Sequence, residues 1–205
     1  MDIVLASRNK KKVEELRKIM EAAIAVETDV SVNILTPDAF PACGDVEEDG
    51  DTFEANAVKK AVYISKCSGL TAVADDSGLE VDALGGAPGV YSARYAGEPP
   101  DDMANNRKLL DEMEGVPEGK RTARFVCCIA LASGDEVKTF MGYVEGKIGK
   151  ENRGESGFGY DPVFYPEGHD RTFAEMSDDG KNALSHRGRA LKALQGHLKE
   201  KGFKT

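Results

Sequence analysis

Two long runs of strand-forming residues, separated by a very short link, constrain the fold of this chain more than any other feature. The first run is TARFVCCIALAS at 122–133, and the second is EVKTFMGYVEGKI at 136–148. Gly134-Asp135 lies between them and is a turn signal. We therefore expect a long β-hairpin, so the sheet that contains it has at least one antiparallel pair of strands.

Shorter apolar runs alternate with helical patterns on both sides of this hairpin. Strands are predicted at 2–6, 30–35 and 71–75, and helices from near Asn9, from Asp51 to about Cys67, at 101–114 and at 181–199. Asp51 is the expected N-cap of the second helix, with Glu54 completing a capping box. The alternation predicts an α/β fold, and the hairpin makes its sheet mixed. Neither a repeat nor a linker interrupts residues 1–205, so we predict a single domain.

Charge and composition exclude several classes of protein. The chain has 36 acidic and 27 basic residues and a formal net charge of −9, which argues against a nucleic-acid binder. Its apolar runs are shorter than the roughly 20 residues that a membrane span needs. The apolar stretch after Met1-Asp2 is too short for a secretory signal, so we expect a cytoplasmic protein with no membrane partner.

The cysteines indicate the same compartment. They show no CxxC spacing, and we predict that all of them are reduced thiols: Cys43, Cys67, Cys127 and Cys128.

The densest basic run, RNKKK at 8–12, falls where the first strand turns into the first helix. A helix N-terminus binds phosphate through its free N–H groups and its dipole. Three lysines oppose that dipole unless an anion is present. The alternative is a solvated helix start.

Asp75 and Asp76 follow an apolar strand side by side. Two neighbouring carboxylates repel each other unless a positive group lies between them or beside them. Carboxylate oxygens suit Mg²⁺, which also bridges to substrate phosphates. The acidic residues Glu47, Glu48 and Asp49 are candidates to complete such a site, and the alternative is a simple turn.

Two segments near the C-terminus suit a nucleotide. In SGFGYDPVFYP at 156–166, Phe158 is a candidate to stack on a base, and the alternative is an aromatic residue of the core. Asp161 is a candidate to accept from ring N–H groups, and the alternative is that it shapes a turn. In KNALSHRGRAL at 181–191, a second cationic cluster is expected from Lys181, His186 and Arg187. Arg187 lies on the apolar stripe of that helix, so an internal carboxylate partner is the alternative. Together these features predict a Mg²⁺–nucleotide pocket.

Five stretches make the sequence resemble the inosine triphosphate pyrophosphatase family: LASRNKKKVEEL, EEDGDTFEANAVKKA, DDSGLEVDALGGAPGVYSARYAG, GFGYDPVF and LSHRGRAL. The resemblance implies an elongated mixed sheet with helices in two lobes flanking a central substrate cleft. It also implies a Mg²⁺-dependent homodimer. The implied reaction converts the purine nucleoside triphosphates ITP, dITP and XTP to the nucleoside monophosphate and pyrophosphate.

The resemblance also implies residue roles. Asp76 corresponds to the proton acceptor and a metal ligand, and Glu47 to the other metal ligand. Substrate contacts are implied for Ser7, Arg8, Asn9, Lys10, Lys11, Lys12, Ser77, Phe158, Gly159, Tyr160, Asp161, Lys181, His186 and Arg187. Many family members carry Thr-Gly-Asn where this chain has Ser7-Arg8-Asn9, which leaves the contact of Arg8 open. We expect Lys12 and Lys181 to stabilise the departing pyrophosphate.

Two other functions use the same pocket. A non-catalytic nucleotide sensor would bind the triphosphate without releasing pyrophosphate. A phosphomonoesterase would release inorganic phosphate, but the chain lacks the DxDx[TV] pattern of one such class.

Overall fold

The computed structural model describes residues 2–7, 12–14, 16–17 and 33–200. Within these residues, one six-stranded sheet has the order β2-β1-β3-β4-β5-β6. The strands are β1 (Asp2–Leu5), β2 (Asn33–Leu35), β3 (Thr71–Val81), β4 (Thr122–Ser133), β5 (Glu136–Ile148) and β6 (Phe164–Pro166). β1 pairs in parallel with β2 and with β3, whereas β5 and β6 are antiparallel. The predicted mixed α/β fold is confirmed.

Four α-helices have both ends within the described part of the chain: α2 (Phe53–Ser68), α3 (Asp102–Glu112), α4 (Asp178–Leu184) and α5 (His186–Glu200). Short 3-10 helices are η1 (Pro37–Ala39), η2 (Asp82–Leu84), η3 (Gly89–Arg94), η4 (Glu118–Lys120) and η5 (Phe173–Glu175). Residues 12–14 and 16–17 are helical, as predicted, while the expected start at Asn9 lies outside the described residues. None of the described helices has the length and apolar character needed to cross a membrane.

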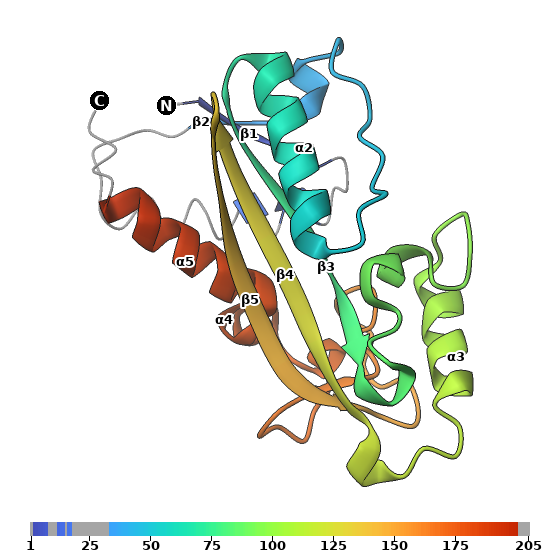
Figure 1. The fold of residues 1–205 in the computed structure, drawn as a ribbon. Coiled ribbons are helices and arrows are strands. Elements are labelled where there is room, and N and C mark those ends of the chain that lie inside the picture. Colours follow the sequence, from blue (N-terminus) through green and yellow to red (C-terminus); the bar gives the residue numbers. More distant parts are fainter. Residues whose placement is uncertain (1, 8–11, 15, 18–32, 201–205) are drawn as a thin grey trace. The chain divides into compact units, whose positions relative to one another are not determined.

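The predicted hairpin is confirmed. β4 and β5 are neighbours in the sheet and run side by side in Figure 1. Gly134 in the link has a φ of +59°, a left-handed conformation that glycine adopts without steric cost. The two-residue link can join these strands only in antiparallel order.

The chain divides into two compact units. Unit 1 comprises Met1–Asp76, Cys127–Gly142 and Arg187–Thr205, and unit 2 comprises Ser77–Val126 and Tyr143–His186. β3, β4 and β5 each contribute residues to both units. The single domain, the elongated outline and the central cleft stay predictions.

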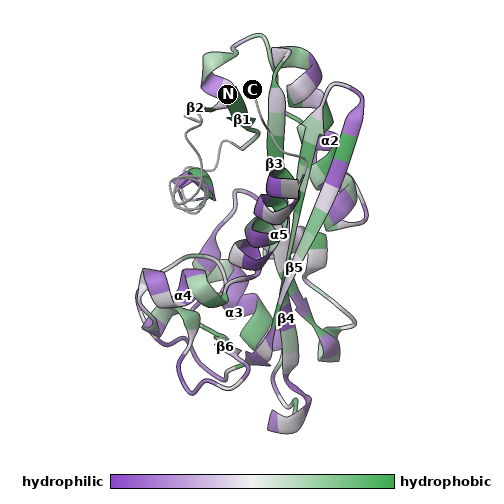
Figure 2. Cartoon of the chain, turned by 90° about the vertical axis from the view of Figure 1, so that its left-hand side faces the viewer, coloured by the Kyte–Doolittle hydropathy of each residue, from purple (hydrophilic) through white to green (hydrophobic). Residues whose placement is uncertain are grey.

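Each unit has its own apolar core. In unit 1, strand residues such as Ile3, Val73 and Ile129 pack with Leu191 and Leu194 of α5. Figure 2 shows the mixed hydropathy of α5, whose other side carries exposed residues. In unit 2 the core is aromatic, and the Phe125 ring centroid lies 4.7 Å from that of Phe164 and 5.9 Å from that of Phe173.

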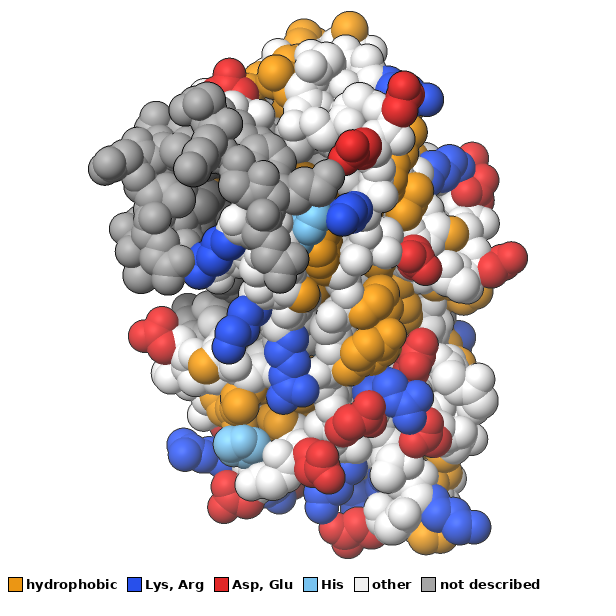
Figure 3. Space-filling model, turned by 60° about the vertical axis from the view of Figure 1, so that its left-hand side comes forward, with side chains coloured by type: hydrophobic (Ala, Val, Ile, Leu, Met, Phe, Trp, Pro, Cys, Tyr) orange, Lys and Arg blue, Asp and Glu red, His pale blue; other side chains and the backbone are white. Residues whose placement is uncertain are grey.

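Charged side chains of both signs are interspersed on the face shown in Figure 3. This agrees with the composition, in which acidic residues exceed basic ones by only nine. Local groups of charge therefore matter more for binding than the net charge.

Besides shifts of one or two residues at other ends, three boundaries near the predicted site differ from the predicted ones. β3 continues to Val81, so the segment after Asp75 is strand rather than loop. α2 is capped by Thr52, whose side chain accepts a hydrogen bond from the Ala55 N–H at 3.1 Å, and not by Asp51. The predicted last helix is two helices, because Ser185 is extended at a ψ of 149°.

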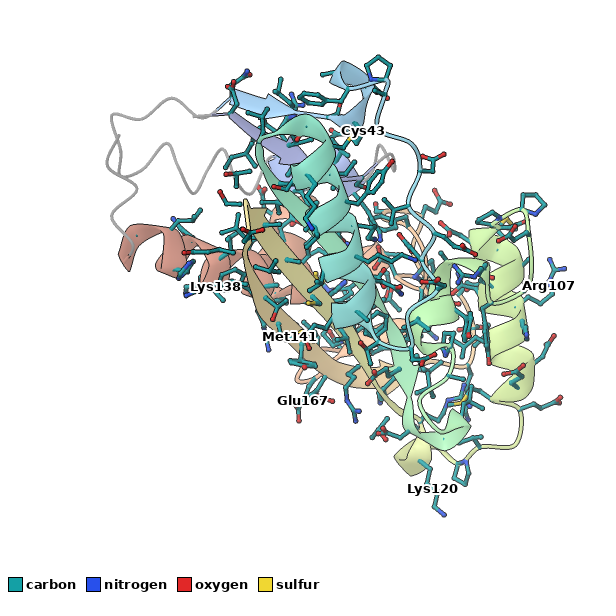
Figure 4. All side chains as sticks on the ribbon, turned by 45° about the horizontal axis from the view of Figure 1, so that its top comes forward. Cys43, Arg107, Lys120, Lys138, Met141 and Glu167 are labelled. Atoms are coloured by element: carbon teal, nitrogen blue, oxygen red, sulfur yellow. A yellow bond between two sulfur atoms is a disulfide. The ribbon has the colours of Figure 1, made fainter. Side chains whose placement is uncertain are left out.

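The prediction of four reduced thiols is wrong for two of them. Cys43 and Cys67 form a disulfide that links the segment after η1 to the end of α2, with Cα atoms 5.8 Å apart (Figure 4). Two residues separated by 24 positions carry no local signal for this pairing. Cys127 and Cys128 are free and buried, as predicted.

Candidate active site

Asp75 and Asp76 lie within β3 and point to opposite faces of the sheet, because successive strand residues alternate. Val73, which shares the side of Asp75, packs in the core cluster that includes α5. Asp76 shares its side with Ala72 and Ala74 and contacts α2 instead. The expected repulsion between neighbouring carboxylates is therefore relieved by the strand itself.

Asp75 faces two cationic side chains of this chain, those of Arg187 and Lys12. Arg187, at the start of α5, is 2% exposed, and its Nε and Nη2 atoms lie 3.3 Å from Asp75 Oδ2. Lys12 Nζ lies 3.8 Å from the same oxygen. Burial alone would raise the pKa of the Asp75 carboxyl, but the charges of Lys12, Arg187 and Lys60 outweigh it and hold the pKa below its usual range. Asp75 is therefore a structural anion, and the internal-carboxylate alternative for Arg187 is confirmed.

Asp76 has a different environment. Its Oδ2 accepts a hydrogen bond from Asn56 Nδ2 at 3.1 Å, and its Oδ1 lies 3.8 Å from Lys60 Nζ. Burial raises the pKa of Asp76 and Glu48 raises it further, while Lys60, Lys12 and Asn56 act in the opposite direction, so the pKa stays above its usual value. A buried carboxylate with a raised pKa is a stronger proton acceptor than an ordinary aspartate.

Lys60 of α2 connects the carboxylates of this region. Its Nζ donates to Glu48 Oε1 at 2.6 Å and to the backbone oxygen of Asp75 at 2.7 Å. Burial alone would lower the pKa of Lys60, but Asp76, Asp75 and Glu48 together raise it, so the side chain stays charged. One buried cation thus stabilises two acidic side chains of the predicted site.

The acidic segment 43–50 runs antiparallel to α2 and is attached to it at five places. The pairs are Cys43–Cys67, Gly44 N to Tyr63 Oη at 3.1 Å, Glu48–Lys60, Asp49–Lys59 at 2.6 Å, and Gly50 N to Asn56 Oδ1 at 2.8 Å. Glu47 is an exposed residue of this segment. Helix α2 therefore sets the position of the segment that carries the predicted metal-linked acid.

The residues present suit a magnesium ion in their chemistry. Among the described residues, no three acidic, histidine or cysteine side chains come together as a ligand set. Mg²⁺ does not need three, because it keeps several waters and binds one or two carboxylates together with substrate phosphates. Asp76 and Glu48 are close enough for their charges to repel, which raises the pKa of Asp76 and favours a cation there. Glu47 and Asp76 as metal ligands stay predictions.

Only part of the predicted phosphate-binding turn can be placed. Ser7 follows β1 and donates its N–H to the Leu5 oxygen at 2.8 Å, and Lys12 reaches Asp75. Arg8, Asn9, Lys10 and Lys11 lie outside the described residues. Lys12 and Ser7 belong to unit 1, together with Asp76 and Arg187.

Unit 2 holds the predicted base-binding segment. Asp161 is buried and its Oδ2 accepts hydrogen bonds from Phe158 N at 2.9 Å and from Lys181 Nζ at 2.7 Å. Lys181 Nζ also lies 4.7 Å from the centroid of the Phe158 ring. These contacts support the alternative in which Asp161 shapes a turn, and they hold Phe158 beside a cation.

The remaining predicted residues of unit 2 have separate partners. The Tyr160 hydroxyl donates to the Ser92 oxygen at 2.9 Å, and the His186 ring stacks on Phe125 at 4.8 Å. Ser77 is half-buried in β3. The predicted cationic cluster is not one group of free cations, because Lys181 pairs with Asp161 whereas Arg187 pairs with Asp75.

A cavity of about 800 Å³ in unit 2 has a structural cation in its wall. Its lining includes Arg107, Glu118, Arg121 and Lys150. Arg121 is buried, and its guanidinium donates to the backbone oxygens of Ile148 at 2.8 Å and Gly149 at 2.6 Å. Its donors therefore tie the chain together rather than face a ligand.

Sequence reasoning missed Asn56 and Lys60, the two side chains of α2 that contact Asp76. Their spacing of four puts them on one helix face, which was the available signal. A polar pair on the buried side of a helix is unusual, because such groups need internal partners.

Comparisons with known proteins agree on one family. The sequence profile of the Ham1 family matches residues 3–197. A protein of Desulforamulus reducens named dITP/XTP pyrophosphatase is 52% identical over 94% of this chain and 92% of its own length. A protein of Geobacter sulfurreducens with the same name is 50% identical over 98% of both chains.

Solved structures lead to the same family. The Ham1 protein of Staphylococcus aureus superposes with a TM-score of 0.86 at 41% identity, covering 98% of this chain and 100% of its own. A dITP/XTP pyrophosphatase from Mycobacterium abscessus has a TM-score of 0.78 at 44% identity, covering 95% and 98%. The resemblance seen in the sequence is thus confirmed, and the chain belongs to the Ham1 family.

Proposed function

We propose that this chain hydrolyses dITP, ITP and XTP to the nucleoside monophosphate and pyrophosphate, and so removes these nucleotides from the cellular pool. The observation that carries the proposal is Asp76, a buried carboxylate with a raised pKa beside a buried lysine. The relatives named dITP/XTP pyrophosphatase support the choice of substrates.

In the proposed mechanism, Asp76 takes the proton of the water that attacks the α-phosphorus. Asn56 and Lys60 hold the Asp76 carboxylate in place, and Lys60 keeps Glu48 next to it. A Mg²⁺ ion held by Asp76 and Glu47 would neutralise charge that develops on the phosphates. Lys12 would stabilise the departing pyrophosphate by its charge.

For Lys181 we propose a role in addition to the expected stabilisation of the departing pyrophosphate. Lys181 lies against Asp161 and the Phe158 ring, so we propose that it contacts the nucleotide at the base-reading segment 158–161. Phe158 would stack on the purine, and polar groups of the segment would pair with a 6-oxo ring. A 6-amino base would leave those polar groups unpaired, and such mismatches reduce kcat/KM by orders of magnitude.

The proposal includes a homodimer in the cytoplasm, where the nucleotide pool is. Light scattering tests the dimer directly, since the chain has a mass of 22.1 kDa. The disulfide is uncommon for that compartment, so its oxidation state in cells tests the location.

The decisive experiment measures pyrophosphate released from dITP, with Mg²⁺ present or removed by a chelator. We expect Asp76→Asn to abolish release while dITP still binds, because the amide cannot accept the proton. Asp38→Asn, at an exposed position in η1, is the matched control and should keep wild-type activity. Inorganic phosphate as product would identify a phosphomonoesterase. Binding without either product would identify a nucleotide sensor.

A further inference from the structure

Helix α3 contacts the base-reading segment 158–161, although no predicted site residue lies on it. Asn106 Nδ2 donates to the backbone oxygen of Gly159 at 2.7 Å. Asp102 Oδ2 accepts from the N–H of the same residue at 2.8 Å. Asp102 and Asn106 are one helical turn apart, so a single face of α3 binds both polar groups of Gly159.

Gly159 occupies the centre of the turn that carries Phe158. The turn is closed by the Asp161 N–H, which donates to the Phe158 oxygen at 3.3 Å. Gly159 has a φ of +62°, a conformation that side-chain-bearing residues rarely adopt. The turn lies in the segment between β5 and β6 and outside the strands themselves, so contacts from other parts of the chain help to fix it in place.

The anchors of this turn fall into two groups. Lys181 and the Phe158 N–H both bind the Asp161 carboxylate at the end of the turn. Asp102 and Asn106 bind the Gly159 peptide in its middle. Gly157 is packed closely against this carboxylate, because a Cβ atom added there would clash with Asp161 Oδ2. Loss of the α3 contacts would free the middle of the turn while its end stays fixed.

Asn106 is a buried side chain whose amide joins α3 to the turn. It is 3% exposed, and its amide nitrogen donates to the Asp102 and Gly159 backbone oxygens, both at 2.7 Å. Two carbonyl partners settle which end of the amide is nitrogen. Its Oδ1 atom is buried and has no hydrogen-bond partner among the described residues. Burying an acceptor without a partner costs free energy. The hydrogen bonds that the Asn106 amide donates must offset this cost.

We infer that Asn106, assisted by Asp102, is a positioning residue that sets base specificity by fixing the Gly159 peptide. The inference rests on the proposed function, because it assigns a role in reading the base. Neither side chain is proposed to touch the nucleotide. Shifts of about 1 Å in a binding segment are enough to change discrimination between substrates.

Asn105 supplies a matched control. It is the neighbouring residue on α3 and is 2% exposed, but its amide binds a different segment, through the Ala93 oxygen at 3.0 Å and the Ala96 N–H at 2.7 Å. Asn105→Ala therefore removes the same chemical group at the same depth without releasing Gly159. Arg107, which follows Asn106 on α3, is exposed and points away from the rest of the chain (Figure 4).

The test compares kcat/KM for dITP and for dATP, read as pyrophosphate release. We expect Asn106→Ala to lower the dITP-to-dATP ratio about 10-fold, mostly through a higher KM for dITP, since a mispositioned site loses discrimination. Asp102→Ala should lower it about 3-fold because its contact is exposed, and Asp102→Asn, which can still accept, should restore it. Asn105→Ala should leave the ratio unchanged.

An unchanged ratio in folded Asn106→Ala, or an equal loss in Asn105→Ala, would overturn the inference. If Asn106→Ala does not fold, Asp102→Ala carries the test, and an unchanged ratio overturns it there too. Hydrogen exchange of peptides covering 154–163 gives a readout without substrate. Faster exchange in the Asn106 and Asp102 variants supports the contact even if wild type fails to hydrolyse dITP, which would refute the proposed function alone.

Discussion

Asp75 and Asp76 are neighbours in sequence, yet β3 gives them different partners and different chemistry. Asp75 is bound by Arg187 and Lys12, and those charges keep it ionised. Asp76 has a weaker set of donors and a raised pKa. At the residue scale, the first is suited to holding the fold together and the second to accepting a proton.

We expect Asp75→Asn to destabilise the protein. The substitution leaves the Arg187 guanidinium buried without an opposing carboxylate, and breaking a buried ion pair from one side costs about 3–5 kcal/mol. Urea unfolding measures the change. Glu118→Gln, which removes an exposed ion pair with Lys147, is the control and should leave the midpoint unchanged. An equal effect of both variants would contradict the role of Asp75.

The free thiols should be inert in the folded protein. Burial raises the pKa of Cys128 to about 12, and Glu54 and Asp76 add to the effect. At pH 8 about one thiol in ten thousand would then be ionised, against about a quarter for an ordinary cysteine. We expect iodoacetamide to label Cys127 and Cys128 only after unfolding in urea, with mass spectrometry as the readout. Rapid labelling of the native protein at pH 8 would refute this.

At the scale of elements, α2 contacts both Asp76 and the acidic segment 43–50 of unit 1. Its inner face contacts Asp76, and its flank holds the acidic segment 43–50 at five places. The start of the helix is fixed by Thr52 and its end by the disulfide at Cys67. Substitutions at either end of α2 should therefore alter the position of the acidic segment 43–50.

The cap of α2 can be tested by a pair of substitutions. Thr52→Ala removes the acceptor of the Ala55 N–H and should cost about 1 kcal/mol of stability, the usual value for an N-cap. Asp51→Ala should cost clearly less, because Asp51 is not the cap. Thermal unfolding of both variants decides the matter. A larger loss at Asp51 would restore the boundary expected from the sequence.

The disulfide predicts a redox-dependent stability. Closing a loop of 24 residues is worth about 3 kcal/mol in the chain-entropy view. Dithiothreitol should therefore lower the melting temperature of the wild-type protein. The double variant Cys43→Ser/Cys67→Ser should melt at the lower temperature with or without the reductant. A wild-type melting curve that ignores dithiothreitol would count against a stabilising disulfide.

Local patterns predicted most elements because their signals are local. The hairpin of β4 and β5, helix α3 and the first strand follow from apolar periodicity and turn residues. β3 was predicted too short, because Asp-Asp-Ser-Gly is typical of a turn. Partners from distant parts of the chain, such as Arg187 and Lys60, let the two aspartates continue a buried strand.

The site was predicted less completely than the fold. Asp76 was predicted as the proton acceptor from the sequence, but its contacts with Asn56 and Lys60 depend on how α2 packs. Asp102 and Asn106 belong to no sequence motif. They bind the backbone of Gly159, and a contact with backbone atoms does not require a particular residue type in the segment that is bound. Residue type can be read from a sequence, whereas partners depend on tertiary structure.

At the scale of the whole molecule, an acidic chain must bind an anionic substrate through local cations. The net charge of −9 makes sequence-independent binding to a polyanion unfavourable. We expect no gel-shift complex with a 20–30 base-pair duplex at 150 mM salt, even at about 100 µM protein, where basic proteins bind. A shifted band under these conditions would contradict the prediction and point to a basic surface.

β3 pairs with β1 through Ile3↔Thr71, Val4↔Ala72 and Leu5↔Val73. This register determines which side of the sheet each of the two following aspartates faces. Adding or deleting one residue between Val73 and Asp75 would reverse the sides of the two acids, so that Asp76 would face Arg187 and Asp75 would face α2. Among relatives, the number of residues between the part of β3 that pairs with β1 and the two aspartates should therefore be constant.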